Sequence, residues 1–127
     1  MDMDRAPETL RGLQEVVRRE IDAYVYEVPS NSIGNAWTAE QVSERLEQMR
    51  LAIVSPYWVE VEIRDSFEEI TKEVPVLRKC AVVVDNGSGT ALLWDPLLRD
   101  FFLAKRRDNT LISFGVRGDA VGCFLAI

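Results

Sequence analysis

The chain has 127 residues, of which 47% are hydrophobic and 28% are charged, and its formal net charge is −6 with no histidine. This composition fits one globular domain and excludes a disordered chain. The absence of histidine excludes Ser-His-Asp and Cys-His hydrolases, His-Glu-x-x-His metalloproteases and zinc deaminases with a histidine ligand. We therefore expect a single domain over residues 1–127, with a flexible start at residues 1–7.

Segment 9–28 has apolar residues spaced by three or four positions, which predicts an amphipathic helix. These residues are Leu10, Leu13, Val17, Ile21, Tyr24 and Val28. Pro29 ends the predicted helix and opens a loop that extends to about Ala36.

A second amphipathic helix is predicted to begin after Thr38, because Thr38 and Gln41 have the spacing of a capping box. The apolar residues that repeat the helical period are Val42, Leu46, Met49 and Ile53. Ser55 and Pro56 are then expected to end this segment.

The period changes from 3.6 to 2 after the second helix. Val59, Val61 and Ile63 face one side of a predicted strand, and the opposite, outer side carries charged residues and a tryptophan. The residues on that outer side are Trp58, Glu60, Glu62 and Arg64.

The pattern between Ser66 and Glu73 is ambiguous between a short helix and a loop. Ser66 and Glu69 have capping spacing, and a short helix here would turn Phe67 and Ile70 inward.

The remaining chain predicts hairpins followed by one closing element. Strands at Cys80–Val84 and Thr90–Trp94 flank turn residues 85–89, and strands at Phe101–Lys105 and Leu111–Phe114 flank a second turn. Asp119 is expected to cap a closing helix over residues 120–126, with a last strand as the alternative. Helices first and strands after predict an α+β fold, with two N-terminal helices packed on one face of a mainly antiparallel sheet of about 4–6 strands.

Cys80 and Cys123 both stand among apolar residues. This predicts buried free thiols in a reducing compartment, with a disulfide as the alternative. No apolar run is long enough to span a bilayer. We therefore expect a cytoplasmic protein that does not enter membranes.

One group of residues is a candidate binding site for a protein partner. Trp58, Glu60 and Glu62 share a strand face, and Glu68 and Glu69 follow closely, so these five residues predict a surface for a basic partner. One alternative is that these residues form only the solvent-exposed face of a strand. The other is a catalytic site in which the paired carboxylates of Glu60 and Glu62 act as general acid and general base.

Other patterns are weaker. The aspartates in the predicted turns lack EF-hand spacing, and the glycines lack a Walker-A or dinucleotide pattern, so we expect no metal and no cofactor. The basic run Lys105–Arg107 is typical of a solvated turn, with contact to phosphate or an acidic partner as the alternative. Net acidity argues against general nucleic-acid binding.

Charge is unevenly distributed along the chain. Residues 1–73 contain 16 acidic and 8 basic residues, whereas residues 74–127 contain 5 acidic and 7 basic ones. The chain is similar to compact bacterial immunity proteins, which neutralise a cognate toxin, in size, acidity and α+β layout rather than in any motif. We expect a non-enzymatic protein-binding module of this immunity or adaptor type that captures a basic protein. A small-ligand-binding or regulatory domain and a histidine-free enzyme are the alternatives, and a homodimer is compatible with all three.

Overall fold

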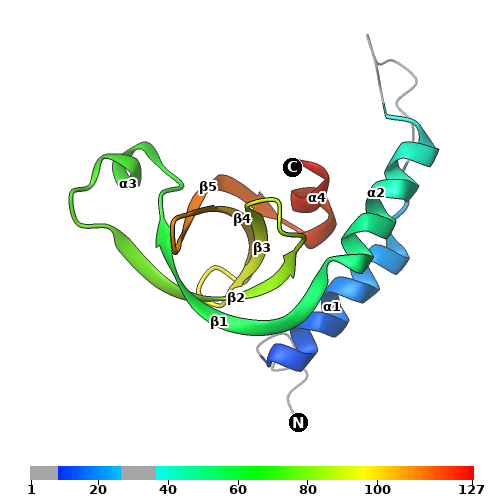
Figure 1. Cartoon of the computed structure of the whole chain (residues 1–127), viewed down its shortest axis with the longest axis horizontal. Coiled ribbons are helices and arrows are strands. Elements are labelled where there is room, and N and C mark those ends of the chain that lie inside the picture. The colour runs from blue at the N-terminus through cyan, green and yellow to red at the C-terminus, as the bar shows by residue number, and fades with distance from the viewer. Residues whose placement is uncertain (1–8, 27–36) are drawn as a thin grey trace.

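The computed structural model describes residues 9–26 and 37–127, so the predicted flexible start and the loop up to Ala36 lie outside the described residues. Four helices and five strands follow one another in the described chain (Figure 1). They are α1 (Leu10–Ala23), α2 (Ala39–Leu51), β1 (Ile53–Ile63), α3 (Phe67–Thr71), β2 (Val76–Asp85), β3 (Thr90–Asp95), β4 (Asp100–Arg107), β5 (Thr110–Gly118) and α4 (Ala120–Leu125).

The five strands close into a small barrel in the order β1-β2-β3-β4-β5. Consecutive strands pair antiparallel, and β1 pairs parallel with β5 through Val61 opposite Leu111 and Glu62 opposite Ile112. The predicted α+β class, the mainly antiparallel pairing and the number of strands are confirmed, and the closure of the sheet into a barrel is a feature that the sequence did not predict. Closure pairs the two strands that would otherwise be exposed edges of an open sheet.

The barrel has two apolar layers, one inside it and one between its outer surface and the helices. The inner layer consists of Val61, Ile63, Cys80, Val82, Ala91, Leu93, Phe102, Ala104 and Leu111. The outer layer joins α1, α2 and α4 to outward residues such as Val83, Trp94 and Leu103. Middle strands β2, β3 and β4 are therefore buried on both faces, which explains their continuous apolar sequences.

Helix α1 buries Leu13, Val17 and Ile21, as its spacing predicts, and the Thr9 side chain accepts a hydrogen bond from the Gly12 amide (2.9 Å). The helix ends at Ala23 instead of residue 28, because Tyr24 already has an extended backbone. The β-branched and aromatic residues after Ala23 have low helix propensity.

Helix α2 begins as predicted, with a complete capping box between Thr38 and Gln41. Its predicted extension to Ile53 is wrong, since Ile53 begins β1. Pro56, which was expected to break the chain, lies inside β1 where the pairing with β2 shifts register. Proline has no amide hydrogen to donate, so such an irregularity is where a strand tolerates it.

The closing segment is a helix, which settles the two alternatives for residues 120–126. The Asp119 carboxylate accepts a hydrogen bond from the Gly122 amide (3.0 Å) and so caps α4. Helix α4 buries Ala120, Val121, Cys123 and Phe124. None of the helices in the described part of the chain is long and apolar enough to cross a membrane.

Candidate functional site

A short helical excursion projects from the barrel on the side away from α1 and α2 (Figure 1). It consists of residues 64–75, which join β1 to β2 and contain α3, and we call it the α3 arm. Its helix begins with the predicted capping box, in which the Ser66 hydroxyl accepts from the Glu69 amide (3.2 Å) and the Glu69 carboxylate accepts from the Ser66 amide (3.1 Å). The same carboxylate accepts from the Asp65 amide (3.2 Å).

Arg64 holds the other end of the α3 helix. Its Nη1 donates to the backbone carbonyls of Glu69 (2.6 Å), Ile70 (3.1 Å) and Lys72 (2.9 Å). Its Nε pairs with the Glu62 carboxylate at 2.8 Å. One guanidinium therefore binds three carbonyls at the C-terminal end of the helix, of which the Glu69 carbonyl also accepts from the Lys72 amide (3.4 Å). Sequence reasoning missed this role, because the arginine precedes the carbonyls it caps and matches no capping pattern.

The base of the arm is fastened to β5. The Asp65 carboxylate accepts from the Gly115 amide (2.9 Å) and pairs with Arg117 Nε (2.7 Å). Gly115 has φ +91°, and a Cβ there would approach the Asp65 carbonyl oxygen at 3.2 Å, so glycine allows this close contact. The arm is thus held at its base and at both ends of its helix.

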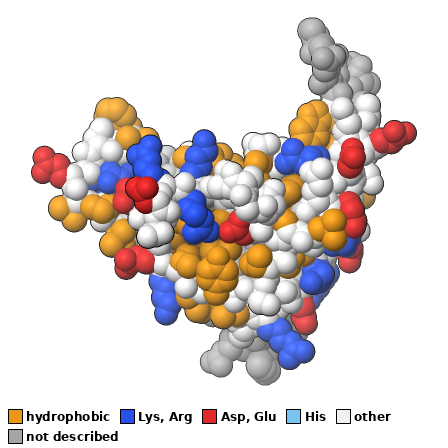
Figure 2. Space-filling view, viewed as in Figure 1, with side chains coloured by type: hydrophobic (Ala, Val, Ile, Leu, Met, Phe, Trp, Pro, Cys, Tyr) orange, Lys and Arg blue, Asp and Glu red, His pale blue; other side chains and the backbone are white. Residues whose placement is uncertain are grey.

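The arm presents large apolar side chains to solvent. Phe67 is 81% exposed and Ile70 is 59% exposed, so their predicted inward orientation is wrong. Val74 is 80% exposed, and Leu77 at the start of β2 is 51% exposed. The arm extends beyond the barrel, whose interior is already filled by the inner layer. Figure 2 shows hydrophobic side chains over this end of the molecule, with acidic and basic side chains beside them.

Phe67, Ile70, Val74 and Leu77 form what we call the arm patch. Phe67 and Ile70 stand three positions apart and so share one face of α3. Soluble monomers rarely expose several neighbouring large apolar residues unless they mark an interaction site. The arm patch is therefore the strongest candidate for a functional site among the described residues.

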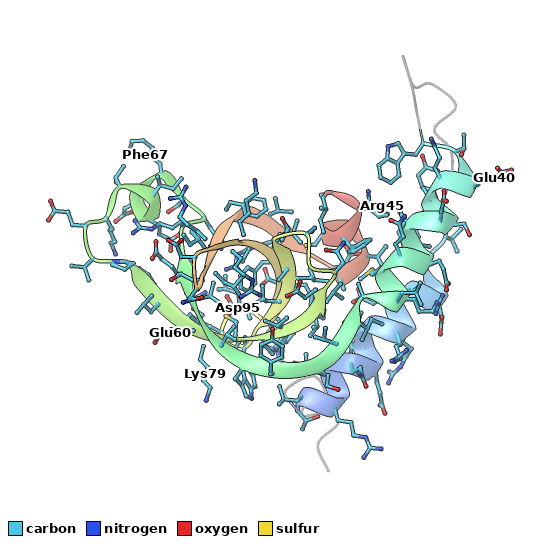
Figure 3. All side chains as sticks on the ribbon, viewed as in Figure 1. Glu40, Arg45, Glu60, Phe67, Lys79 and Asp95 are labelled. Carbon is cyan, nitrogen blue, oxygen red and sulfur yellow. The ribbon has the colours of Figure 1, made fainter. Side chains whose placement is uncertain are left out.

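The structure places the five predicted binding residues in three different settings. Glu60 and Glu68 are exposed, and Glu60 stands opposite Lys79 on the outer face of the barrel (Figure 3). Glu62 is held by Arg64, and Glu69 is held in the capping box. Trp58 is partly buried against the layer under the helices, and the Lys79 ammonium lies 5.9 Å from its ring centroid.

The arm is strongly acidic. Residues 60–73 contain six acidic and two basic residues. One of these two bases, Arg64, is already occupied by Glu62 and the three carbonyls of the arm. The arm thus combines exposed apolar side chains with a net negative charge.

A second charged cluster lies within the barrel, around Asp95 (Figure 3). Asp95 is 0% exposed, and its carboxylate accepts from Arg78 and Arg117 and from the amides of Leu97 (2.9 Å) and Leu98 (3.3 Å). Arg117 also pairs with Asp100 at 2.8 Å. Sequence reasoning treated Asp95 only as one of the aspartates in the predicted turns, because its arginine partners stand 17 and 22 positions away.

The two cysteines are free and buried, as predicted. Burial raises the pKa of both thiols to about 12. Both are therefore protonated at neutral pH, and a protonated thiol is a poor nucleophile and metal ligand. Within residues 9–26 and 37–127, no group of three or more Cys, Asp or Glu side chains is arranged to hold a metal ion.

Replacing Arg64 by alanine is expected to loosen the arm while the barrel stays folded. Losing the charged hydrogen bonds to the carbonyls of Glu69, Ile70 and Lys72 should lower the local opening free energy by about 1.5–3 kcal/mol. Amide hydrogen exchange followed by mass spectrometry should then show faster exchange in residues 67–72 and unchanged exchange in β3. Arg50→Ala, which removes exposed pairs with Asp22 and Glu47, is the matched control. Unchanged protection of the arm would show that Arg64 does not hold it.

No protein-family model, curated protein or solved structure matches this chain.

Proposed function

We propose that the protein is a non-enzymatic protein-binding module that captures a basic protein partner through the α3 arm. The observation that carries this proposal is the exposure of Phe67 (81%), the aromatic residue of the arm patch. Burying an exposed phenylalanine in a partner's pocket contributes about 1.5–3 kcal/mol. Aromatic side chains, phenylalanine among them, are enriched at the buried cores of protein interfaces.

The charge around the arm patch specifies the partner's chemistry. Glu60, Glu68 and Glu73 are exposed at or beside the arm, and they favour a partner with lysines and arginines around an apolar pocket. Complementary charge of this kind mainly accelerates association, while the buried apolar centre slows dissociation. This arrangement suits an immunity-type or adaptor protein that must capture its partner rapidly.

The attachment of the arm lowers the cost of binding. The capping box at Ser66, the carbonyl contacts of Arg64 and the anchoring of Asp65 to β5 already order the backbone that presents Phe67. A preordered segment loses less conformational entropy when it binds. The held arm therefore supports a docking role more than a role as a solvated connection.

The predicted alternatives receive less support from these contacts. General acid and base catalysis by Glu60 and Glu62 needs both carboxylates to meet in a cleft. They lie instead on the outer surface of the barrel, and Glu62 is engaged by Arg64. A ligand inside the barrel would compete with the side chains of the inner layer, since barrels of few strands are filled by their own residues.

Photo-cross-linking tests the proposal. Phe67 is replaced by photoreactive p-benzoylphenylalanine, and cells of the source organism that express this variant are irradiated. The matched control carries the same group at Leu97, which is 67% exposed in the β3–β4 turn. The expected result is one cross-linked protein from position 67 only, whose cross-linked peptide lies among lysines or arginines. Cross-linking from both positions to the same products, or to an acidic surface, would contradict the proposal.

Reversing charge on the arm should slow association with the identified partner. Glu68→Lys combined with Glu73→Lys should lower the association rate constant about tenfold at low salt, and the difference should shrink as salt rises. Glu62 and Glu69 are unsuitable for this test because both hold the arm's structure. Glu44→Lys on α2 is the control for charge far from the arm. Stopped-flow fluorescence measures the rates, and an equal effect of Glu44→Lys would contradict a local role of the arm's charge.

A further inference from the structure

The hairpin of β4 and β5 carries a groove of opposite charge to the arm. It has a volume of about 390 Å³ and is lined by Lys105, Arg106, Arg107, Ile112, Ser113 and Phe114. Three consecutive basic residues therefore border an exposed aromatic ring in a chain whose net charge is −6. No motif accounts for this concentration of positive charge.

Strand geometry divides the three basic residues between two faces. Arg106 pairs with Asp85 at 3.1 Å, so its charge is compensated within the chain. Lys105 and Arg107 project to the opposite face, together with Ile112, which stands opposite Lys105 in the pairing of β4 and β5. Both basic side chains are exposed.

Phe114 contributes apolar surface to the groove. Its ring is partly exposed, and the Lys105 ammonium lies 5.4 Å from the ring centroid. The groove thus combines an apolar surface formed by Ile112 and Phe114 with two accessible cations. This combination matches an apolar side chain flanked by carboxylates.

We propose that this groove binds an acidic peptide segment of a partner protein. The segment's apolar side chain packs on Ile112 and Phe114, and its flanking carboxylates pair with Lys105 and Arg107. A peptide fits better than a nucleic acid because the acidic arm lies next to the groove, where Asp65 of the arm accepts from the Gly115 amide beside Phe114. A continuous polyanion that ran past the groove would meet the net negative charge of the arm, whereas a short peptide places its carboxylates only at the two cations.

The groove and the arm are separate binding surfaces of opposite sign. The arm selects a basic surface, and the groove selects an acidic segment. The groove proposal does not rest on the arm, because Lys105, Arg107 and Phe114 make none of the contacts that hold the arm. A protein with both surfaces is able to bridge two partners, which extends the proposed function to that of an adaptor.

Fluorescence anisotropy and NMR with a defined probe test the groove. The probe is a fluorescein-labelled peptide in which two leucines are flanked on both sides by glutamates. The full chain should bind it, with amide shift changes concentrated at residues 105–107 and 112–114. Lys105→Glu combined with Arg107→Glu should weaken binding by at least about tenfold. Arg11→Glu combined with Arg18→Glu, an equal charge change on exposed positions of α1, should leave binding within about twofold after correction for net charge.

Three results would overturn the groove proposal. The first is equal binding of a peptide with glutamines in place of glutamates, or no binding of either peptide. The second is tighter binding of fluorescein-labelled oligothymidylate, which would assign the groove to single-stranded nucleic acid. The third is a dimer in sedimentation that Lys105→Glu with Arg107→Glu dissociates, which would assign the groove to a second copy of the chain. Cross-linking from position 67 is unaffected by these variants, so the two proposals fail or succeed separately.

Discussion

Replacing Asp95 by alanine is expected to lower the free energy of unfolding by about 3–5 kcal/mol, the usual cost of removing one partner from a buried ion pair. Asp95 is fully buried, and its removal leaves Arg78 and Arg117 without their shared carboxylate. The turn amides of Leu97 and Leu98 lose their acceptor as well. Urea denaturation followed by circular dichroism measures the change.

Asp22→Ala is the matched control, since Asp22 also pairs with an arginine, Arg50, but on the surface. Exposed pairs of this kind contribute about 0–1 kcal/mol. Asp95→Asn keeps the size of the side chain and one carbonyl oxygen, so it provides a folded variant if the alanine variant does not fold. Equal destabilisation by Asp95→Asn and Asp22→Ala would show that the buried charge adds nothing.

The same residue makes stability depend on pH. Burial favours the neutral acid, but the hydrogen bonds from the Leu97 amide, Arg78 and the Leu98 amide outweigh it and lower the pKa of Asp95 below its usual 3.8. A lowered pKa means that this contribution to stability is fully present above the unfolded-state value and is lost as pH falls through the folded-state value. Acid unfolding should therefore be less steep in Asp95→Asn than in the wild-type chain below about pH 4.

Replacing Phe67 by alanine should weaken binding of the cross-linked partner by about thirtyfold or more, equivalent to a loss of at least 2 kcal/mol at a central interface residue. The stability of the chain should change by less than about 0.5 kcal/mol, because the ring is exposed and contributes little to the folded state. Isothermal titration calorimetry with the purified partner measures the affinity, and urea denaturation measures the stability.

Leu97→Ala is the control for this prediction, since it removes another exposed apolar side chain outside the arm. It should leave affinity unchanged. A large loss of stability in Phe67→Ala with intact affinity would show that the ring packs against the chain itself and would contradict its role as an anchor.

Local features of this protein follow directly from its sequence. The caps at Thr38, Ser66 and Asp119 are confirmed, since each depends on residues no more than three positions apart. The apolar stripe of α1 and the turn at residues 85–89 are confirmed for the same reason, with the Gly87 amide donating to the Asp85 carboxylate (2.9 Å). These elements form because short-range hydrogen bonds and side-chain periodicity decide them.

The candidate site followed from the sequence only in part. The acidic character of residues 60–73 and the capped helix within them are visible in the sequence. The spacing of Phe67 and Ile70 indicates an amphipathic helix, but periodicity does not say whether another element covers its apolar face. The role of Arg64 and the partners of Asp95 also depend on tertiary structure.

Closure of the barrel determines which distant residues meet and which apolar residues remain exposed. It pairs Val61 with Leu111 across 50 positions and fills the interior with residues from all five strands except where the charged cluster around Asp95 lies. Because that interior is filled, the connection between β1 and β2 has no apolar surface inside the barrel to pack against, and Phe67 and Ile70 project into solvent. Contacts between distant residues depend on which strands meet, and hydrophobic burial is non-directional, so only the assembled fold determines which apolar residues remain exposed.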